Sequence, residues 1–287
     1  MRMKTILAVL VFVSLAVGAS AQQRAVDPNS GGTLHLFHPK PVGEGDFVIA
    51  PEARGGGNLI NHGGPVITNA KQVSIFWGTE WGTQSNPSQL ASDMMAFFAN
   101  FGTTGEYNVI TQYSGIQTTN LTNVSWWDGA NPPTNVTDTA LRNEVKKYLN
   151  AVHGGIADAS TIYEVFLPST SYSSSGGSTS CGGPNLQYCA YHSHFSFNGV
   201  DVKYSSLPYP SCGGCQWTGF TTAQNFDHFA CHETREAVTD PDLNAWYDRQ
   251  GNEADDKCAW SPAPFIDAGF GYQWEWSNQN RGCVKTK

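Results

Sequence analysis

The spacing of hydrophobic and polar positions predicts a mixed set of strands and helices from about residue 65 to the C-terminus. Residues 72–77 and 161–167 are apolar and rich in strand formers, so both are predicted to be strands. Residues 189–197 alternate, which predicts a further strand with His192 and His194 on one face. These histidines are interpreted as hydrogen-bonded strand residues, and a role in orienting substrate or stabilising an oxyanion is the alternative. Residues 265–287 predict a strand with one aromatic face, formed by Phe270, Tyr272, Trp274 and Trp276. Core packing is the favoured interpretation of that face, and a platform for sugar rings or peptide side chains is the alternative.

Helical spacing of apolar residues predicts three helices. Asn86 caps the first with Pro87 at its opening position, and the helix continues through Phe98. Thr137 caps the second, which is amphipathic. The third begins at Thr221 or Thr222 and runs to about Val238, before Pro241 prevents its continuation. Alternating helices and strands of this kind predict one α+β domain with a mixed sheet.

The first 64 residues differ in composition from the rest of the chain. Residues 1–21 combine a positive start, an apolar run and a small-residue end, which is typical of a signal peptide. Residues 22–64 are rich in Gly and Pro and predict an irregular leader: a propeptide, a surface spacer or an arm packed on the domain. Its histidines, His35, His38 and His62, are interpreted as solvated loop residues and not as ligands. The Ser/Gly-rich stretch 169–183 is expected to be an exposed, mobile loop.

Net charge and hydropathy exclude two classes of partner. The chain carries a formal charge of −8, and its 16 Lys and Arg residues are few and unclustered, which argues against nucleic-acid binding. After residue 21 no apolar stretch approaches the length of a membrane span. We therefore expect a secreted, extracellular protein, or a periplasmic one in a Gram-negative source. The oligomeric state is left open.

Ionisable residues gather on the third predicted helix at a spacing that a metal site requires. His232 and Glu236 are four residues apart and therefore share one helix face, whereas Glu233 projects about 100° away. In a metallohydrolase helix of this pattern, the Glu after the first His acts as general base. The alternative is structural: exposed glutamates, an Arg235 ion pair and a packed His232.

The segment His-Glu-Thr-Arg-Glu-Ala-Val-Thr-Asp, followed by Asn252-Glu-Ala-Asp-Asp256, resembles the thermolysin-type gluzincin metallopeptidases. The resemblance implies that His232, Glu236 and Glu253 bind zinc, with Glu233 as general base. It also implies that Asp256 supports Glu253. Tyr247, Asp240 and Asp256 are the nearest candidates for oxyanion stabilisation and for orienting the helix or the ligands. Because two of the three ligands are carboxylates, manganese or calcium are further candidates.

A second resemblance extends over about 200 residues. The blocks Ile75-Phe-Trp-Gly, Tyr163-Glu-Val-Phe-Leu-Pro, Cys212-Gly-Gly-Cys and Asn244-Ala-Trp-Tyr, in this order, resemble the EXORDIUM/phosphate-induced protein family. Membership implies secretion and association with walls or extracellular matrix. Proximity and this resemblance together suggest disulfides Cys181–Cys189, Cys212–Cys215 and Cys258–Cys283. Cys231 is then the unpaired cysteine; a buried, packed thiol is favoured over a reactive one.

Two functions follow from these patterns. The first is a secreted zinc-dependent, peptidase-like hydrolase with a metal-activated water and Glu233 as general base. The alternative is a non-catalytic extracellular module associated with cell wall or matrix. The corresponding partners are a peptide or a cell-wall or matrix polymer.

Overall fold

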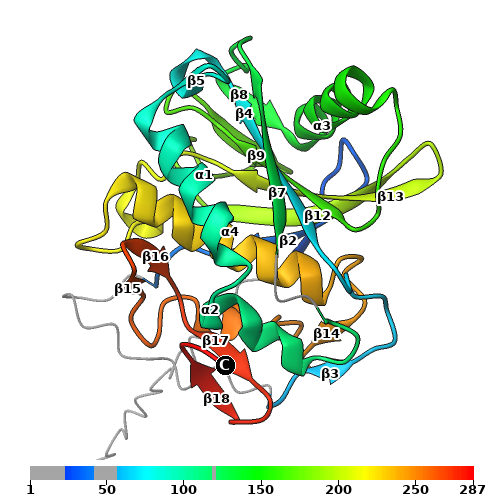
Figure 1. Cartoon of the computed structure of the whole chain (residues 1–287), viewed down its shortest axis with the longest axis vertical. Helices are drawn as coiled ribbons and strands as arrows, with labels where there is room; N and C mark the ends of the chain where they lie inside the picture. The colour runs from blue at the N-terminus through cyan, green and yellow to red at the C-terminus, as the bar shows by residue number, and fades with distance from the viewer. Residues whose placement is uncertain (1–22, 42–56, 118–120) are drawn as a thin grey trace, which may run out of the picture.

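A mixed seven-stranded sheet runs through the centre of the molecule (Figure 1). The computed structural model describes residues 23–41, 57–117 and 121–287. The strand order is β1-β2-β12-β13-β9-β4-β7, with β13, β9, β4 and β7 parallel and the other pairs antiparallel. The predicted α+β class is confirmed. The bounds are Arg24–Val26 (β1), Thr33–Phe37 (β2), Lys71–Trp77 (β4), Thr122–Asp128 (β7), Thr161–Phe166 (β9), Ala190–Phe197 (β12) and Val200–Leu207 (β13).

Helices cover both faces of the sheet, and each face has its own hydrophobic core. α1 (Gln89–Phe101) and α4 (Thr222–Thr239) pack on one face with the C-terminal hairpins, and α3 (Asp138–His153) packs on the other. Strand β9 is buried along its whole length because both of its faces are covered. Its alternate residues Ile162 and Phe166 join one core, while Tyr163 and Val165 join the other.

The predicted helices form, with one shifted start. Thr137 caps α3 as expected, since its side chain accepts a hydrogen bond from Ala140 N. Helix α1 begins at Gln89, because Ser88 and not Asn86 provides the capping oxygen, to Ala91 N. Asn86–Pro87 instead form the short strand β6, which pairs with β5 (Gly82–Thr83). A four-residue helix α2 (Gly105–Asn108) follows α1.

The N-terminal segment, residues 23–41, is an ordered part of the domain, which corrects the expectation of an irregular leader. Strand β2 pairs with β12 and carries the buried residues Leu34, Leu36 and Phe37. Residues 1–22, which include the predicted signal peptide, and residues 42–56 lie outside the described parts of the chain.

The Ser/Gly-rich stretch 169–183 is also structured, contrary to the expectation of an exposed loop. It contains β10 (Tyr172–Ser175) and β11 (Ser178–Thr179), and β10 pairs with β8 (Asn135–Thr137). Ser173 and Ser180 are completely buried, and Ser173 N donates to Ser180 Oγ at 2.9 Å. Small hydroxyl side chains that satisfy backbone groups fit between packed strands, which composition alone did not reveal.

The aromatic C-terminal stretch forms two hairpins and not one strand. β15 (Phe265–Asp267) pairs with β16 (Phe270–Tyr272), and β17 (Glu275–Ser277) pairs with β18 (Gly282–Val284). Tyr272 and Trp276 are buried, and Phe270 and Trp274 pack against the same core. Core packing is therefore confirmed for these aromatic residues. A further small sheet joins β3 (Ile60–Asn61) to β14 (Trp246–Tyr247).

Three disulfides are present, and two of the expected pairings are wrong. The bonds join Cys181–Cys212, Cys189–Cys215 and Cys258–Cys283. Cys212 and Cys215 flank one turn, and each faces a cysteine of the 181–189 segment at a Cα separation of 5.4 Å. Closeness in the sequence was a poor guide because the pairing depends on how two separate loops meet. The disulfides are consistent with an extracellular protein.

The remaining cysteine, Cys231, is free and fully buried, as expected. Burial raises the pKa of its thiol, which keeps it protonated and packed in the core. Within the described part of the chain, no helix is both long and apolar enough to cross a membrane.

Candidate metal centre

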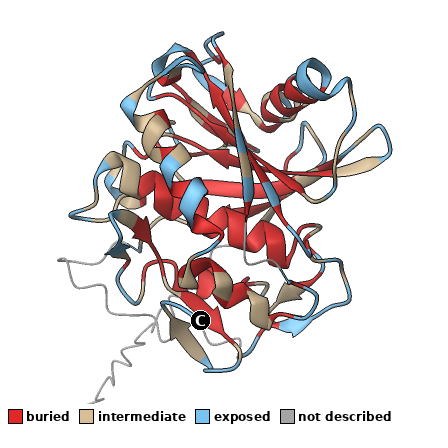
Figure 2. Ribbon diagram, in the orientation of Figure 1, coloured by how far each residue is buried: buried red, intermediate tan, exposed pale blue. Residues whose placement is uncertain are grey.

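Helix α4 is buried and carries three of the predicted site residues, His232, Glu233 and Glu236. Thr221 and Gln224 form a capping box at its start, which confirms the predicted helix and its capping residue. Figure 2 shows the helix buried along most of its length, between the sheet and the C-terminal hairpins, and all residues from 225 to 239 are buried. Polar side chains on such a helix require partners, because an unpaired buried polar group costs free energy.

The predicted ligands His232, Glu236 and Glu253 are each 0% exposed. His232 Nε2 lies 3.1 Å from Glu236 Oε2, as the four-residue spacing on one helix predicted. The alternative in which the glutamates of this helix are exposed is therefore wrong. The predicted Arg235 ion pair does form: the guanidinium bonds to Asp255 and lies 3.4 Å from Glu275 Oε2.

A first group of possible ligands consists of His35, His192, Glu236 and Glu253, whose donor atoms all lie within 4.8 Å of one another. His35 and His192 are directly opposed on β2 and β12, so their side chains share one face of the sheet. His35 Nδ1 lies 3.1 Å from Glu253 Oε1, and His192 Nε2 lies 3.6 Å from Glu253 Oε2 and 3.7 Å from Glu236 Oε2. Four separate segments of the chain meet here.

A second group adjoins the first and shares Glu236. It consists of His232, Glu236 and Asp256, again with donor atoms within 4.8 Å of one another. Glu236 Oε1 accepts a hydrogen bond from Asp256 N at 3.0 Å, which leaves Oε2 facing the imidazoles. The predicted ligand set is thus divided: Glu236 and Glu253 belong to the first group, and His232 belongs to the second.

The donor atoms lack other hydrogen-bond partners and have the spacing that a bound cation requires. Both ring nitrogens of His192, both carboxylate oxygens of Glu253, and Glu236 Oε2 are buried without a hydrogen-bond partner. Tetrahedral ligands at about 2.1 Å from one ion lie about 3.4 Å apart, close to the separations found in the first group. Two imidazoles and two carboxylates form a donor set that zinc accepts. The residues therefore fit a divalent cation.

The electrostatics of the first group favour metal binding. Burial lowers the pKa of His192 well below its usual value, so the imidazole is neutral and able to coordinate. Burial raises the pKa of Glu236 and of Glu253 well above the usual range, and Asp256 and Asp240 respectively add to the effect. A nearby cation would favour the ionised form of these carboxyl groups, which burial disfavours.

Arg24 closes one side of the centre. Its guanidinium donates to Asp240 Oδ2 at 2.9 Å and lies 3.5 Å from Glu253 Oε1. Asp240 also accepts backbone hydrogen bonds from Asn244 and Ala245, so it anchors the turn after α4. The ring of Tyr247 stacks on this guanidinium, 4.3 Å from Cζ, and its contact with the centre is thus through Arg24.

Glu233, the predicted general base, is buried next to the centre but belongs to neither group. Both of its carboxylate oxygens lack a hydrogen-bond partner. Burial, followed by the charges of Glu236 and Glu164, raises its pKa well above the usual value. Burial and these neighbouring charges therefore favour the protonated form of Glu233 when no cation is bound.

Sequence reasoning missed His35 as a ligand and weighed His192 only for a substrate-orienting or oxyanion role. The signal for His35 was present, because Thr-Leu-His-Leu-Phe has the composition of a buried strand. His38 and His62 do stay outside both groups. His194, on the same strand face as His192, is partly exposed and pairs with Asp201 at 2.9 Å.

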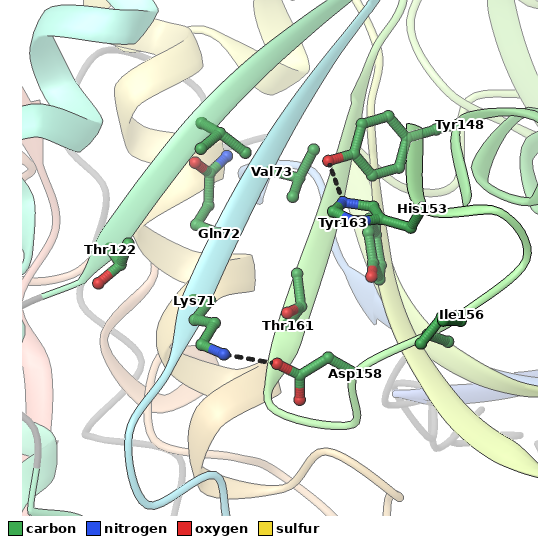
Figure 3. A pocket seen from close by; sticks show the side chains of 12 residues that line it. Lys71, Gln72, Val73, Thr122, Tyr148, His153, Ile156, Asp158, Thr161 and Tyr163 are labelled. Atoms are coloured by element: carbon green, nitrogen blue, oxygen red, sulfur yellow. Dashed lines mark hydrogen bonds and ion pairs between the residues drawn. The ribbon is translucent and has the colours of Figure 1, made fainter. Parts of the chain in front are cut away.

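A separate surface pocket of about 290 Å³ lies beside β4, β7 and β9 (Figure 3). Lys71 pairs with Asp158 at its edge, and the hydroxyl of Tyr148 bonds to His153. None of its lining residues belongs to the metal-ligand groups. The pocket is therefore distinct from the centre.

Comparisons with protein-family models, with curated proteins and with solved structures found no match for this chain. The resemblances to the EXORDIUM family and to the gluzincins therefore stay predictions, and function has to be argued from the site itself.

Proposed function

We propose that this chain is an extracellular zinc-dependent hydrolase of the peptidase type, with the ion bound by His35, His192, Glu236 and Glu253. One observation carries the proposal. Donor atoms from β2, β12, α4 and the segment before Asp256 converge within 4.8 Å, and most of them lack a hydrogen-bond partner. Native proteins rarely leave so many buried polar atoms unsatisfied, so such a set points to a bound group.

Each residue around the proposed zinc ion would have a separate role. Zinc, when bound, supplies a Lewis acid that activates water and polarises a carbonyl. The imidazoles of His35 and His192 and the two carboxylates would hold it. Glu233 would accept and return a proton, since positive charge nearby lowers a carboxyl pKa that burial has raised. Arg24 and Asp240 would keep Glu253 in place.

The complete burial of the centre favours a second candidate, a non-catalytic extracellular module with a structural metal. All four donors are 0% exposed, whereas catalytic zinc sites keep an open position. Two carboxylates also balance the charge of a divalent ion, which reduces its ability to acidify water. The partner would then be a cell-wall or matrix polymer and not a cleavable peptide.

Elemental mass spectrometry of the purified protein, combined with a fluorogenic-peptide screen, separates these candidates. We expect bound zinc in the wild type, loss of zinc in His192→Ala, and retention in His228→Ala, a control at a buried histidine of α4 that belongs to no group of possible ligands. Glu233→Gln should keep the metal and lose hydrolysis. Zinc with no hydrolysis of any peptide would support the structural module, and no metal after zinc addition and dialysis would refute the centre.

A further inference from the structure

We infer that the centre is dinuclear: a second divalent cation binds between His232 and Asp256 and shares the carboxylate of Glu236 with the first. This inference rests on the proposed function for its first ion. His232 belongs only to the second group of donors, whereas His35, His192 and Glu253 belong only to the first. Ligand atoms on one ion lie at most about 4.4 Å apart, so two overlapping groups indicate two ions.

The hydrogen bonds of Gln273 fix the tautomer of His232. Gln273 Nε2 donates to Asp255 O at 2.9 Å and to Asp255 Oδ1 at 2.8 Å, so its amide oxygen is directed toward α4. That oxygen lies 3.1 Å from His232 Nδ1, which must therefore carry the hydrogen and donate it. The lone pair of His232 Nε2 is left free, and a partner of this kind on the other ring nitrogen is typical of metal-binding histidines.

Three imidazole nitrogens surround one carboxylate oxygen. Glu236 Oε2 lies 3.1 Å from His232 Nε2, 3.6 Å from His35 Nε2 and 3.7 Å from His192 Nε2. An ionised carboxylate only accepts hydrogen bonds, and His192 Nε2, His232 Nε2 and Glu236 Oε2 are all buried without a hydrogen-bond partner. His35 Nε2 already bonds to Asp256 Oδ2 at 2.8 Å, and a proton on Glu236 could satisfy only one of the other two nitrogens. A cation on each side of the carboxylate satisfies His192 and His232 together.

The ring of His232 is held in place for this role. Phe37 stacks on it with a centroid distance of 4.1 Å, and Trp260 stacks on Phe37 in turn, at 5.2 Å. Phe37 lies two residues after His35 on β2, so one strand supplies a donor to the first ion and orients a donor of the second. One imidazole and two carboxylates make a harder donor set than the first group, which suits Zn²⁺ or Mn²⁺.

The test is the metal content of the full-length secreted protein, loaded with zinc or manganese and dialysed. We expect two equivalents in the wild type and one in His232→Ala. His228→Ala is the matched control: this buried histidine lies one turn earlier on α4, also contacts Gln273 and belongs to neither group, so it should keep two. Gln273→Leu, which keeps every ligand, should weaken the second site about 10–100-fold.

Three results separate the possible outcomes. One equivalent in the wild type would overturn the second site and leave the proposed function intact, and no metal would overturn both. Two equivalents in both the wild type and His232→Ala would show that the second ion lies elsewhere. If His232→Ala fails to fold, electron paramagnetic resonance of the manganese-loaded wild type decides: two coupled ions support the inference, and an isolated-ion spectrum refutes it.

Discussion

Glu164→Gln should change how the stability of this protein depends on pH. Glu164 lies in the middle of β9 with 0% exposure, and its neighbours across the sheet are Ser74 and Ser205. Thr234 Oγ1 donates to one carboxyl oxygen at 2.5 Å, while the other has no partner. Burial raises the pKa of this carboxyl from 4.5 to about 8.

The direction of this pH effect follows from the protonation of Glu164 in the folded and in the unfolded protein. Folded protein keeps Glu164 protonated up to about pH 8, whereas the unfolded chain ionises it above its ordinary value of 4.5. Between these two pH values, ionisation of Glu164 therefore favours the unfolded state. The contribution of Glu164 to the free energy of unfolding is fully present below pH 4.5 and is lost as the pH rises toward 8. At about 1.4 kcal/mol per pKa unit, the loss reaches at most about 5 kcal/mol. Glutamine has the same shape and does not titrate.

Urea unfolding of the chelator-treated wild type and variant, from pH 4.5 to 8.5, measures this effect. The free energies of unfolding should agree near pH 4.5, and the variant should become the more stable protein by several kcal/mol near pH 8. Asp158→Asn is a contrasting variant. Asp158 is partly buried. Burial raises the pKa of its carboxyl group, but hydrogen bonds, that of Lys71 first, lower it by more, so the net change is a lowering. Removing this charge should therefore cost at most about 1 kcal/mol of stability at neutral pH. A difference between Glu164→Gln and wild type that does not vary with pH would refute the reasoning.

Further predictions concern the N-terminal segment, a disulfide and the metal. Phe37→Ala should reduce the free energy of unfolding by about 3–5 kcal/mol in thermal or urea unfolding, because it leaves a cavity between two stacked rings; a change under 1 kcal/mol would contradict its core role. Replacing Cys181 and Cys212 together by Ser should cost about 3–4 kcal/mol, since their loop spans 31 residues, and peptide mapping under oxidising conditions should recover this pair. A chelator should lower the melting temperature by about 5–10 °C if the metal is present at about 100 times its Kd, and added zinc should restore it. Intact-mass analysis of the secreted protein should show that Arg24 and His35 are retained.

The elements that the sequence predicted well are those decided by local chemistry. The capping threonines Thr137 and Thr221 each bond to an amide three residues on, and this requires nothing beyond the neighbouring backbone. Strand β9 was recognisable because its apolar run is too short for a typical helix and is rich in β-branched and aromatic residues, which favour strands. The spacing of His232 and Glu236 likewise guaranteed their proximity once the helix formed.

What could not be predicted depends on contacts between distant segments. His35 becomes a candidate ligand only because β2 pairs with β12 in a register that places it opposite His192, and nothing within residues 22–64 specifies that register. The disulfide pairing failed for the same reason. The Ser-rich stretch was misjudged because buried hydroxyl groups that bond to backbone look, in composition, like a solvated linker.

The ordered N-terminal segment constrains how any activity of this centre could operate. Residues 23–41 supply His35 to the first group, Phe37 against His232, and Arg24 to both Asp240 and Glu253. A dispensable propeptide would not need to provide a ligand and the only guanidinium that, among the described residues, pairs with Glu253. These contacts favour an arm that is a permanent part of the domain. They also explain the complete burial of the donors, since β2 is the strand that lies beside His192 at this edge. If the proposed cation binds, folding of the N-terminal segment and assembly of the centre are therefore one process, because the segment supplies His35 as a donor and the cation pairs with the buried donor atoms.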